Sequence, residues 1–410
     1  MSVADISIDR THLRVLADRS HLEQQICLHA AHVDGRLVQA NLFTSRTAGI
    51  AGALVGQPVG DVPHRLSQLF PLCGTAHAMA GLMAIEAALQ IEASPAQRAF
   101  RTLVVLAEHC AALVWRTMMD WPLLLGEAPQ VRAYAEVHRV AATVRAAANQ
   151  DCWVRPGGAR LRLERCHLSH AVLELARMVD AAFPEAATDA PGWSALQNAV
   201  QHGASLPARL IRAAHGGALK DYGLHDQPLL RALDVDWCAT RLAADPGFGD
   251  APTLDGTPAE VGALAARRHP AVADAVAQWG PAVATRLLAA ALDLPVMAER
   301  LRRAFNELAD DDPAAVDLTR TGRGSGMVET SRGPLAYLID TAAGQVRMLR
   351  SVAPTEWNFH PDGPFIRALA TAPILPDPVS AARLLAASFD PCVPFNIESA
   401  APDATDAAHA

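Results

Sequence analysis

Aromatic side chains are scarce in this sequence, and strongly basic segments are absent. Phe, Trp and Tyr make up 5% of the residues, whereas 51% are hydrophobic and much of that share is alanine. Because alanine is the best helix former and strands favour aromatic and β-branched residues, the composition predicts a helical protein. The formal net charge of −8 and the lack of a Lys/Arg run give no sign of binding to nucleic acid or to a membrane surface.

Signals for export and for membrane insertion are also missing. The first 20 residues, MSVADISIDRTHLRVLADRS, have no apolar core of the kind that signal peptides carry. No apolar run reaches about 18 residues without a charge, so we expect no transmembrane helix. The seven cysteines are neither dense nor even in number, which argues against a disulfide framework. We therefore expect reduced thiols and a cytoplasmic protein.

The spacing of apolar residues predicts strands near both ends of the chain and helices between them. QQICLHAAHVDGRLVQANLF predicts two strands around a turn at 33–36, and SRGPLAYLIDTAAGQVRMLRSVAP predicts a hairpin that turns near Ala343 and Gly344. Helices are expected after Gly74, after the Ser94 N-cap, and over 127–149, much of 206–310, 364–371 and 378–388. Loops are expected at 154–158, 183–192 and 245–258, and an Ala/Asp-rich, disordered tail from Ser399. The predicted fold class is mainly α with small β-hairpins (α+β).

Two cysteines stand out by their sequence context. Cys73 precedes a glycine and a predicted helix, where the helix dipole and free N–H groups favour a thiolate. A buried structural cysteine is the commoner outcome for such a residue. Cys392, in DPCVPFN, has no second cysteine, histidine or acidic cluster near it in sequence, so it cannot form a local metal site alone.

Other candidate ligands are less specific. Cys166 and His170, in CHLSH, share a helix face at a spacing that can bind zinc or nickel, but the sequence offers no matching second pair. A structural role is the alternative for both. His29 and His32 would lie on opposite faces of a strand and do not form a natural pair.

A glycine-rich segment, TGRGSGMVETSRG, offers a further possibility. It lacks the final Lys-Ser/Thr of a phosphate-binding P-loop, and no helix is predicted after it. Arg332 beside Gly333 can aim a guanidinium at an anion, because glycine allows a close approach of the backbone. A surface arginine is the alternative.

Four motifs, taken in order, resemble the large subunits of [NiFe]-hydrogenases. LCGTAHAMAGLMAIEAAL resembles their first nickel-binding segment, C-G-x-C-x-x-x-H, and DPCVPFNIE resembles the last, D-P-C-x-x-C-x-x-H. ETSRGPLAYLIDTAAGQVRMLRSVAPTEWNFHP is similar to their E-A-P-R-G-x-L-x-H hairpin. HLEQQICLHAAHVDGRL is similar to their first hairpin, with Glu23 at the glutamate of R-x-E-G-H.

The resemblance implies a domain organisation. It covers residues 10–125 and 320–398 and leaves 126–319 as a variable helical middle. It therefore implies one large-subunit-like domain over 1–398, followed by the tail at 399–410. In this fold the N-terminal and C-terminal segments meet at the centre of a helical core.

The departures from the hydrogenase pattern carry information of their own. Cys73 and Cys392 match the first cysteine of each pair, which binds nickel in the enzymes. The remaining cysteine and histidine positions of the two motifs hold residues that do not replace them: Ala76, Ala80, Phe395 and Glu398. Because four thiolates cannot be assembled, the resemblance implies a protein that is not a hydrogenase, and nickel is not expected.

This pattern is similar to that of the HupK/HoxV group of hydrogenase accessory proteins. The resemblance implies a scaffold that holds an Fe(CN)2CO unit on Cys73 and Cys392, within a pocket formed by Arg332, Gly333 and Glu23. The implied partners are the hydrogenase large-subunit precursor and HypC/HypD-type maturation proteins. Two alternatives stay open: a metal-free decoy that binds HypC-type chaperones, and a divergent redox metalloenzyme with a two-cysteine site.

Overall fold

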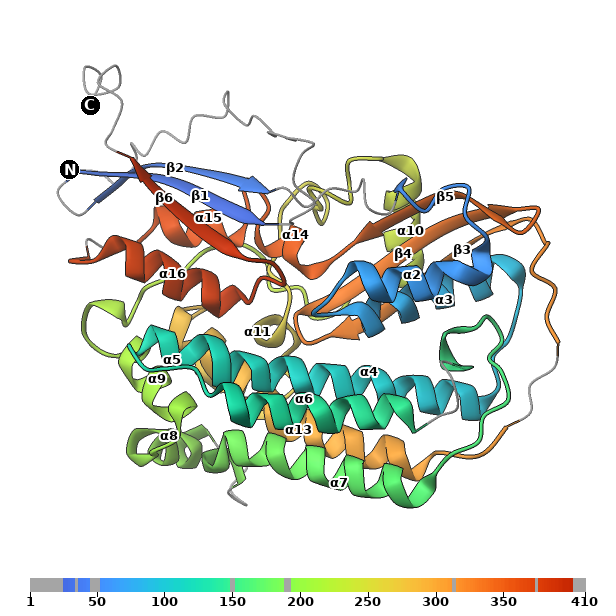
Figure 1. Ribbon diagram of the computed structural model, residues 1–410. Coiled ribbons are helices and arrows are strands. Elements are labelled where there is room, and N and C mark those ends of the chain that lie inside the picture. The colour runs from blue at the N-terminus through green and yellow to red at the C-terminus, as the bar shows by residue number, and fades with distance from the viewer. Residues whose placement is uncertain are drawn as a thin grey trace.

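The computed structural model describes residues 25–33, 36–44, 52–147, 152–187, 193–311, 315–372 and 375–400 (Figure 1). Its strands are β1 (Ile26–Val33), β2 (Arg36–Thr44), β3 (Gly322–Thr330), β4 (Gly333–Ala342), β5 (Gln345–Val352) and β6 (Phe395–Ala400). Its helices are α2 (Val62–Leu69), α3 (Gly74–Leu89), α4 (Pro95–Trp115), α5 (Trp121–Leu124), α6 (Val131–Ala146), α7 (Arg165–Ala182), α8 (Trp193–His202), α9 (Leu206–His215), α10 (Val235–Ala244), α11 (Ala263–Ala266), α12 (Pro270–Trp279), α13 (Val283–Asn306), α14 (Pro354–Asn358), α15 (Pro364–Ala370) and α16 (Pro378–Phe389). The predicted class, mainly α with small β-hairpins, is confirmed.

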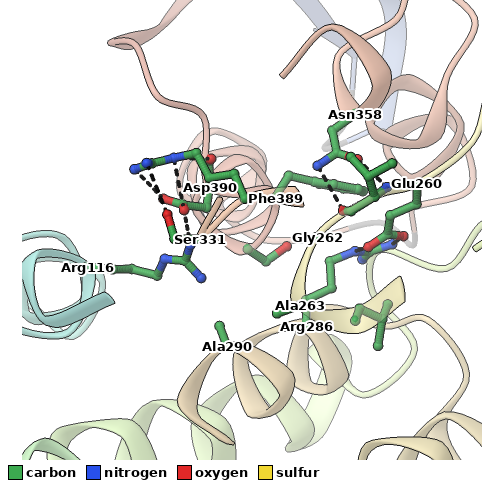
Figure 2. A pocket seen from close by; sticks show the side chains of 14 residues that line it. Arg116, Glu260, Gly262, Ala263, Arg286, Ala290, Ser331, Asn358, Phe389 and Asp390 are labelled. Atoms are coloured by element: carbon green, nitrogen blue, oxygen red, sulfur yellow. Dashed lines mark hydrogen bonds and ion pairs between the residues drawn. The ribbon is translucent and has the colours of Figure 1, made fainter. Parts of the chain in front are cut away.

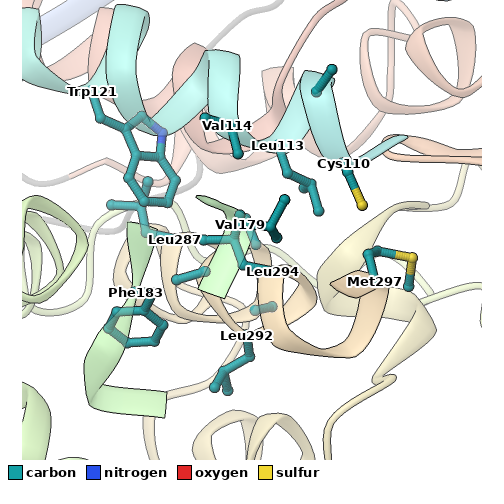
Figure 3. Close-up of a cluster of buried hydrophobic side chains, with 14 of the residues drawn as sticks. Cys110, Leu113, Val114, Trp121, Val179, Phe183, Leu287, Leu292, Leu294 and Met297 are labelled. Carbon is teal, nitrogen blue, oxygen red and sulfur yellow. The ribbon is translucent and has the colours of Figure 1, made fainter. Parts of the chain in front are cut away.

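Helices α4, α6, α7 and α13 form a bundle that contains much of the hydrophobic core (Figure 1). Apolar side chains from α4, α7 and α13 meet inside it, among them Leu113, Val179 and Leu287 (Figure 3). Cys110 is fully buried in the same cluster, which identifies it as a packing residue. Ser94 caps α4 as predicted, because its Oγ accepts a hydrogen bond from the backbone N–H of Gln97 at 3.1 Å.

One helical stretch within the described residues, Pro95–Leu124, is long and apolar enough to cross a membrane by length and composition. Most of its apolar window, 61%, is buried inside the protein. The stretch includes α4, which packs against α13, α6 and α7. The burial identifies it as a core helix, in line with the predicted absence of a membrane span.

The sheet β3–β4–β5 is antiparallel and lies against α3 (Figure 1). The glycine-rich segment is itself strand β3, and its alternate glycines face α3. A Cβ at Gly322, Gly324 or Gly326 would lie within 2.4 Å of backbone atoms of α3. The glycines therefore let a strand backbone touch a helix backbone, which explains their spacing better than a phosphate loop does. The β4–β5 turn falls at Ala343 and Gly344 as predicted, both with positive φ.

The second sheet joins the two ends of the chain in the strand order β2–β1–β6. The predicted β1–β2 hairpin is confirmed, and β1 also pairs in parallel with β6. Figure 1 places this sheet beside α15 and α16. Strand β6 continues to Ala400, so the predicted start of the tail at Ser399 was wrong, because Ser399 and Ala400 pair with β1. The parallel pairing fixes the segment after Cys392 beside β1, which helps to position the site described next.

Candidate metal centre

Cys73 lies at the N-cap of α3, where the chain turns out of α2. A Cβ at the next residue, Gly74, would lie 2.3 Å from the backbone oxygen of Ser67, so only glycine fits at this crossing. The Cys73 carbonyl accepts the first helical hydrogen bond, from the N–H of His77 at 3.0 Å. The thiol is thus fixed at the start of the helix, as the sequence predicted.

A carboxylate from α4 occupies the N-terminus of α3. Glu108 accepts hydrogen bonds from the N–H groups of Thr75 at 2.7 Å and Ala76 at 2.9 Å. Burial raises the pKa of Glu108, although these amide hydrogen bonds lower it. The free N–H groups that were expected to stabilise a Cys73 thiolate are therefore already bound.

Cys392 reaches the same place from the other end of the chain. Helix α16 ends at Phe389, and its C-cap residue Asp390 has a left-handed φ of 50°, which turns the chain out of the helix. The Cys392 thiol lies close enough to Cys73 to raise the pKa of its thiol, and its Sγ lies 3.3 Å from Oγ1 of Thr355. The predicted meeting of the N-terminal and C-terminal segments is confirmed by this contact. Metal binding by the pair stays a prediction.

The expected thiolate at Cys73 was wrong for the metal-free chain. The hydrogen bond with Cys392 and burial raise the pKa of Cys73 well above its ordinary value, and the nearby Glu108 charge raises it further. The charge of Arg332 acts in the opposite direction and is the smaller effect. Cys73 is therefore protonated near neutral pH, so a metal must displace its proton.

Arg332 is buried, with only 6% of its surface exposed, and not a surface arginine. Its Nε donates to the backbone oxygen of Asp390 at 3.1 Å and forms an ion pair with the Asp390 carboxylate at 3.1 Å. Its positive charge is also close enough to Cys73 to act on the pKa of that thiol, which it lowers. The guanidinium is thus held beside the cysteine pair by the residue that begins the Asp390-Pro391-Cys392 segment.

A second buried arginine, which the sequence did not single out, shares the same carboxylate. Arg116 donates from Nη2 to Asp390, and its side chain approaches Asp390 and Ser331 (Figure 2). Burial and the charge of Arg332 lower the pKa of Arg116 to about 9. Two guanidiniums thus meet at one carboxylate near the cysteines, and the charges of Asp293 and Asp120 also act on Arg116.

A π-helical turn, Arg116–Asp120, between α4 and α5 positions Arg116. Such a turn adds one residue to the helical ladder, which rotates the side chains that follow it, and π turns are frequent at functional sites. The sequence offered little signal for it, because an arginine at the end of an apolar helix more often lies in solvent.

A small cavity of about 20 Å³ lies behind this network, enough for about one water molecule. Arg116, Arg332 and Asp390 line it, and Glu260 and Arg286 form a buried ion pair at 2.9 Å on its other side (Figure 2). Neither Cys73 nor Cys392 is among the described residues that line it. The cavity therefore lies beside the ion pairs that hold Arg332, and the two proposed metal ligands are not among the described residues that line it.

The other predicted site residues have different positions. Gly333 follows Arg332 with a φ of 128°, and a Cβ there would lie 3.1 Å from the backbone nitrogen of Gly262, so glycine is needed to turn the arginine inward. Glu23 lies outside the described residues.

Cys166 and His170 are both exposed on α7, away from any group of three metal-binding side chains in the described part of the chain. The interpretation of Cys166 as a helix-packing residue was wrong, because its side chain faces solvent.

Each residue that replaces a hydrogenase ligand belongs to a helix, a strand or an aromatic cluster of the fold. Ala76 is buried in α3, and Ala80 packs its backbone against Gly326 of β3. Phe395 joins an aromatic cluster, with its ring centroid 5.4 Å from that of Phe365. Glu398 lies on β6 opposite His29 of β1. The thiols of Cys73 and Cys392 therefore lie near each other without the bridging cysteines of a hydrogenase.

Comparison with known proteins agrees with this geometry. A family model described as nickel-dependent hydrogenase matches residues 246–397. The hydrogenase expression/formation protein HupK of Bradyrhizobium diazoefficiens is 31% identical, with 84% of this chain and 88% of that protein covered. HoxV of Cupriavidus necator, also a hydrogenase expression/formation protein, is 30% identical, with 85% and 89% covered. The chain belongs to the HupK/HoxV family. HupK of Rhizobium leguminosarum bv. viciae is 29% identical over 86% of this chain and 90% of its own length.

The fold of this HupK/HoxV chain is that of hydrogenase large subunits. The NAD+-reducing [NiFe]-hydrogenase in its H2-reduced state superposes with a TM-score of 0.63 at 16% identity, covering 88% of this chain and 94% of that chain. The reduced Ni-Fe-Se hydrogenase from D. vulgaris Hildenborough gives 0.62 at 14% identity, with the same coverage. At such identities the likeness concerns the fold alone.

Proposed function

We propose that this HupK/HoxV chain is a cytoplasmic hydrogenase maturation scaffold. It holds an Fe(CN)2CO unit between Cys73 and Cys392 and passes it to the precursor of the hydrogenase large subunit, with HypC/HypD-type proteins as further partners. The names of its relatives support the maturation role. The observation that carries the finer proposal is the contact of two thiols from opposite ends of the chain beside two buried arginines.

The charge of the pocket suits such a cargo. Low-spin Fe(II) binds thiolates well because both are soft, and two thiolates with two cyanides leave the iron unit negatively charged. Arg332 and Arg116 both contact Asp390, and the positive charge of Arg332 acts at Cys73. That charge would attract the negative unit, and cyanide nitrogens accept hydrogen bonds from a guanidinium.

The protonation state of the pair suits a site that releases its cargo. Cys73 keeps its proton in the metal-free chain because Cys392 and burial raise its pKa. Iron uptake must expel that proton, and reprotonation favours release. Without the bridging cysteines the iron unit cannot be fixed in a two-metal centre, which also favours transfer. We therefore expect no hydrogen turnover by this chain.

Infrared spectroscopy tests the proposal on full-length protein that is co-expressed with the maturation machinery and purified anaerobically. Cyanide and carbonyl stretches are expected in the unchanged protein and in Cys166→Ser, whose thiol is exposed on α7. They should disappear, together with bound iron, in Cys73→Ser and in Cys392→Ser, because one thiolate cannot chelate. Iron and bands retained in both single variants would refute the scaffold.

Arg332→Lys tests the anion-binding side of the proposal. Lysine keeps the charge but lacks the planar fork that meets Asp390 through two nitrogens. We expect at least ~10-fold weaker iron retention, with shifted cyanide bands, since changing a residue that hydrogen-bonds to the ligands of a metal usually costs about 10–100-fold in metal affinity. Unchanged iron content and bands would remove Arg332 from the site. Arg323→Lys, at an exposed ion pair on β3, is the matched control.

A further inference from the structure

A second cluster of metal-binding side chains lies on the β1–β6 pair, independent of the proposed iron site. Cys27 and His29 are two residues apart on β1, so they share one face of the strand. The other face, with Ile26, Leu28 and Ala30, is buried in the hydrophobic core. The cluster therefore lies on the outer face of the sheet.

Strand β6 supplies the third side chain. In the parallel register, Glu398 is the partner of His29. Its carboxylate lies 3.1 Å from Nε2 of His29 and is close enough to the Cys27 thiol to raise the pKa of that thiol. One ligand atom from each of the three residues lies within 4.8 Å of the other two. The carboxylate thus holds the thiol and the imidazole in one small space.

The donor set is chemically specific. A thiolate, an imidazole and a carboxylate are the three ligand types of zinc, and bond lengths of about 2.0–2.3 Å place such ligand atoms roughly 3.5 Å apart in a tetrahedron. The measured separations need only a small adjustment of side chains that are already partly exposed. Mg²⁺ and Ca²⁺ fit poorly, because they prefer oxygen ligands throughout.

We propose that Cys27, His29 and Glu398 form a binding site for Zn²⁺ or a similar divalent transition metal, with water as the fourth ligand. The thiol loses its proton on binding and no electron is transferred. The metal bridges β1 and β6, and β6 begins three residues after Cys392. Zinc at this position would hold the C-terminal strand on β1 and restrict the movement of Cys392.

Cobalt titration tests the site, because a thiolate bound to Co²⁺ gives an intense charge-transfer absorption. The titration uses the full chain in a Cys73→Ser/Cys392→Ser background, so failure here is distinct from failure of the iron site. We expect one equivalent of Co²⁺ with this absorption, displaced by Zn²⁺. Cys27→Ser should abolish the band, and His29→Gln and Glu398→Gln should each weaken binding at least ~100-fold, more than the loss of a residue that only supports a metal ligand.

The exposed pair on α7 provides the control, and the metal-free circular dichroism of every variant shows whether it folds. Cys166→Ser and His170→Gln should bind Co²⁺ like the background protein. An unchanged titration in Cys27→Ser, or equal loss in the α7 variants, would overturn the proposal. If Cys27→Ser fails to fold, the isosteric Glu398→Gln, with a side chain 68% exposed, decides.

Discussion

The two cysteine clusters of this chain differ most in the charges around them. Cys73 and Cys392 lie beside Arg332 and its buried partner Asp390. Cys27 instead meets His29 and an exposed carboxylate. The first cluster has two buried guanidiniums close to it and suits an iron unit that brings its own anions. The second supplies negative charge and suits a bare cation. Residue type alone does not distinguish the two sites, whereas the neighbouring charges do.

The largest expected difference is in hydrogenase maturation. A strain that carries Cys73→Ser and Cys392→Ser together should lose most of its hydrogenase activity and accumulate unprocessed large subunit, because the iron unit has no carrier. Cys27→Ser should retain most of the activity. Activity assays, with immunoblots showing normal levels of each variant, provide the measurement. Full activity in the double variant would instead favour the decoy that binds HypC-type chaperones without metal.

The next difference is in stability. Asp390→Asn leaves two buried guanidiniums without their carboxylate, and breaking such a pair costs about 3–5 kcal/mol in the free energy of unfolding. Glu398→Gln removes an exposed carboxylate, whose ion pair is worth at most about 1 kcal/mol. Denaturant unfolding of the metal-free variants measures both. Equal costs for the two variants would contradict the distinction between a buried and an exposed charge cluster.

A third difference concerns pH. Contact with Cys392 and burial raise the pKa of Cys73, while burial and Glu398 raise that of Cys27 to about 11. Both thiols are protonated at neutral pH, so metal uptake displaces a proton and strengthens as pH rises. Between pH 6 and 8 we expect at least ~10-fold tighter binding per pH unit at each cluster, and more where two thiols bind. Affinities at three pH values measure this, and a flat profile would contradict a protonated Cys73.

The smallest effects are expected at cysteines outside both clusters. Cys238 is fully buried on α10, so Cys238→Ser places a hydroxyl in an apolar site and costs about 1–3 kcal/mol. Cys166 is exposed, and Cys166→Ser should stay within about 0.5 kcal/mol. Thermal unfolding of the two variants compares them directly. Loss of bound iron in either one would mean that the metal ligands have been misassigned.

Much of the first cluster could be predicted from the sequence, because its residues belong to local motifs. A cysteine before Gly74 and a helical pattern predicts the start of a helix at Cys73. A glycine after Arg332 indicates a tight turn there. Arg116 could not be predicted in this way, since its inward direction depends on a π turn and on the distant Asp390. The thiolate at Cys73 was predicted wrongly because contact with the distant Cys392 and burial raise its pKa, and because Glu108 occupies the helix N-terminus from another element.

The second cluster depends on strand pairing, which short motifs do not encode. The C-x-H spacing on β1 is visible in the sequence, but Glu398 joins it only through the parallel β1–β6 register. The glycines of β3 were likewise considered as a possible loop, because nothing local reveals that they meet the backbone of α3. In both cases the missing information is a contact between segments far apart in the chain.

The parallel pairing of β1 with β6 also sets an order for biosynthesis. Strand β6 and Cys392 leave the ribosome long after Cys73, because most of the described chain lies between the two cysteines. A nascent chain therefore exposes half of each metal cluster and completes neither. Closing so long a loop is entropically costly and slow, so these contacts form late in folding. In the proposed scaffold, metal uptake would therefore require synthesis at least through Cys392, and a copy terminated before Cys392 would be unable to take up cargo.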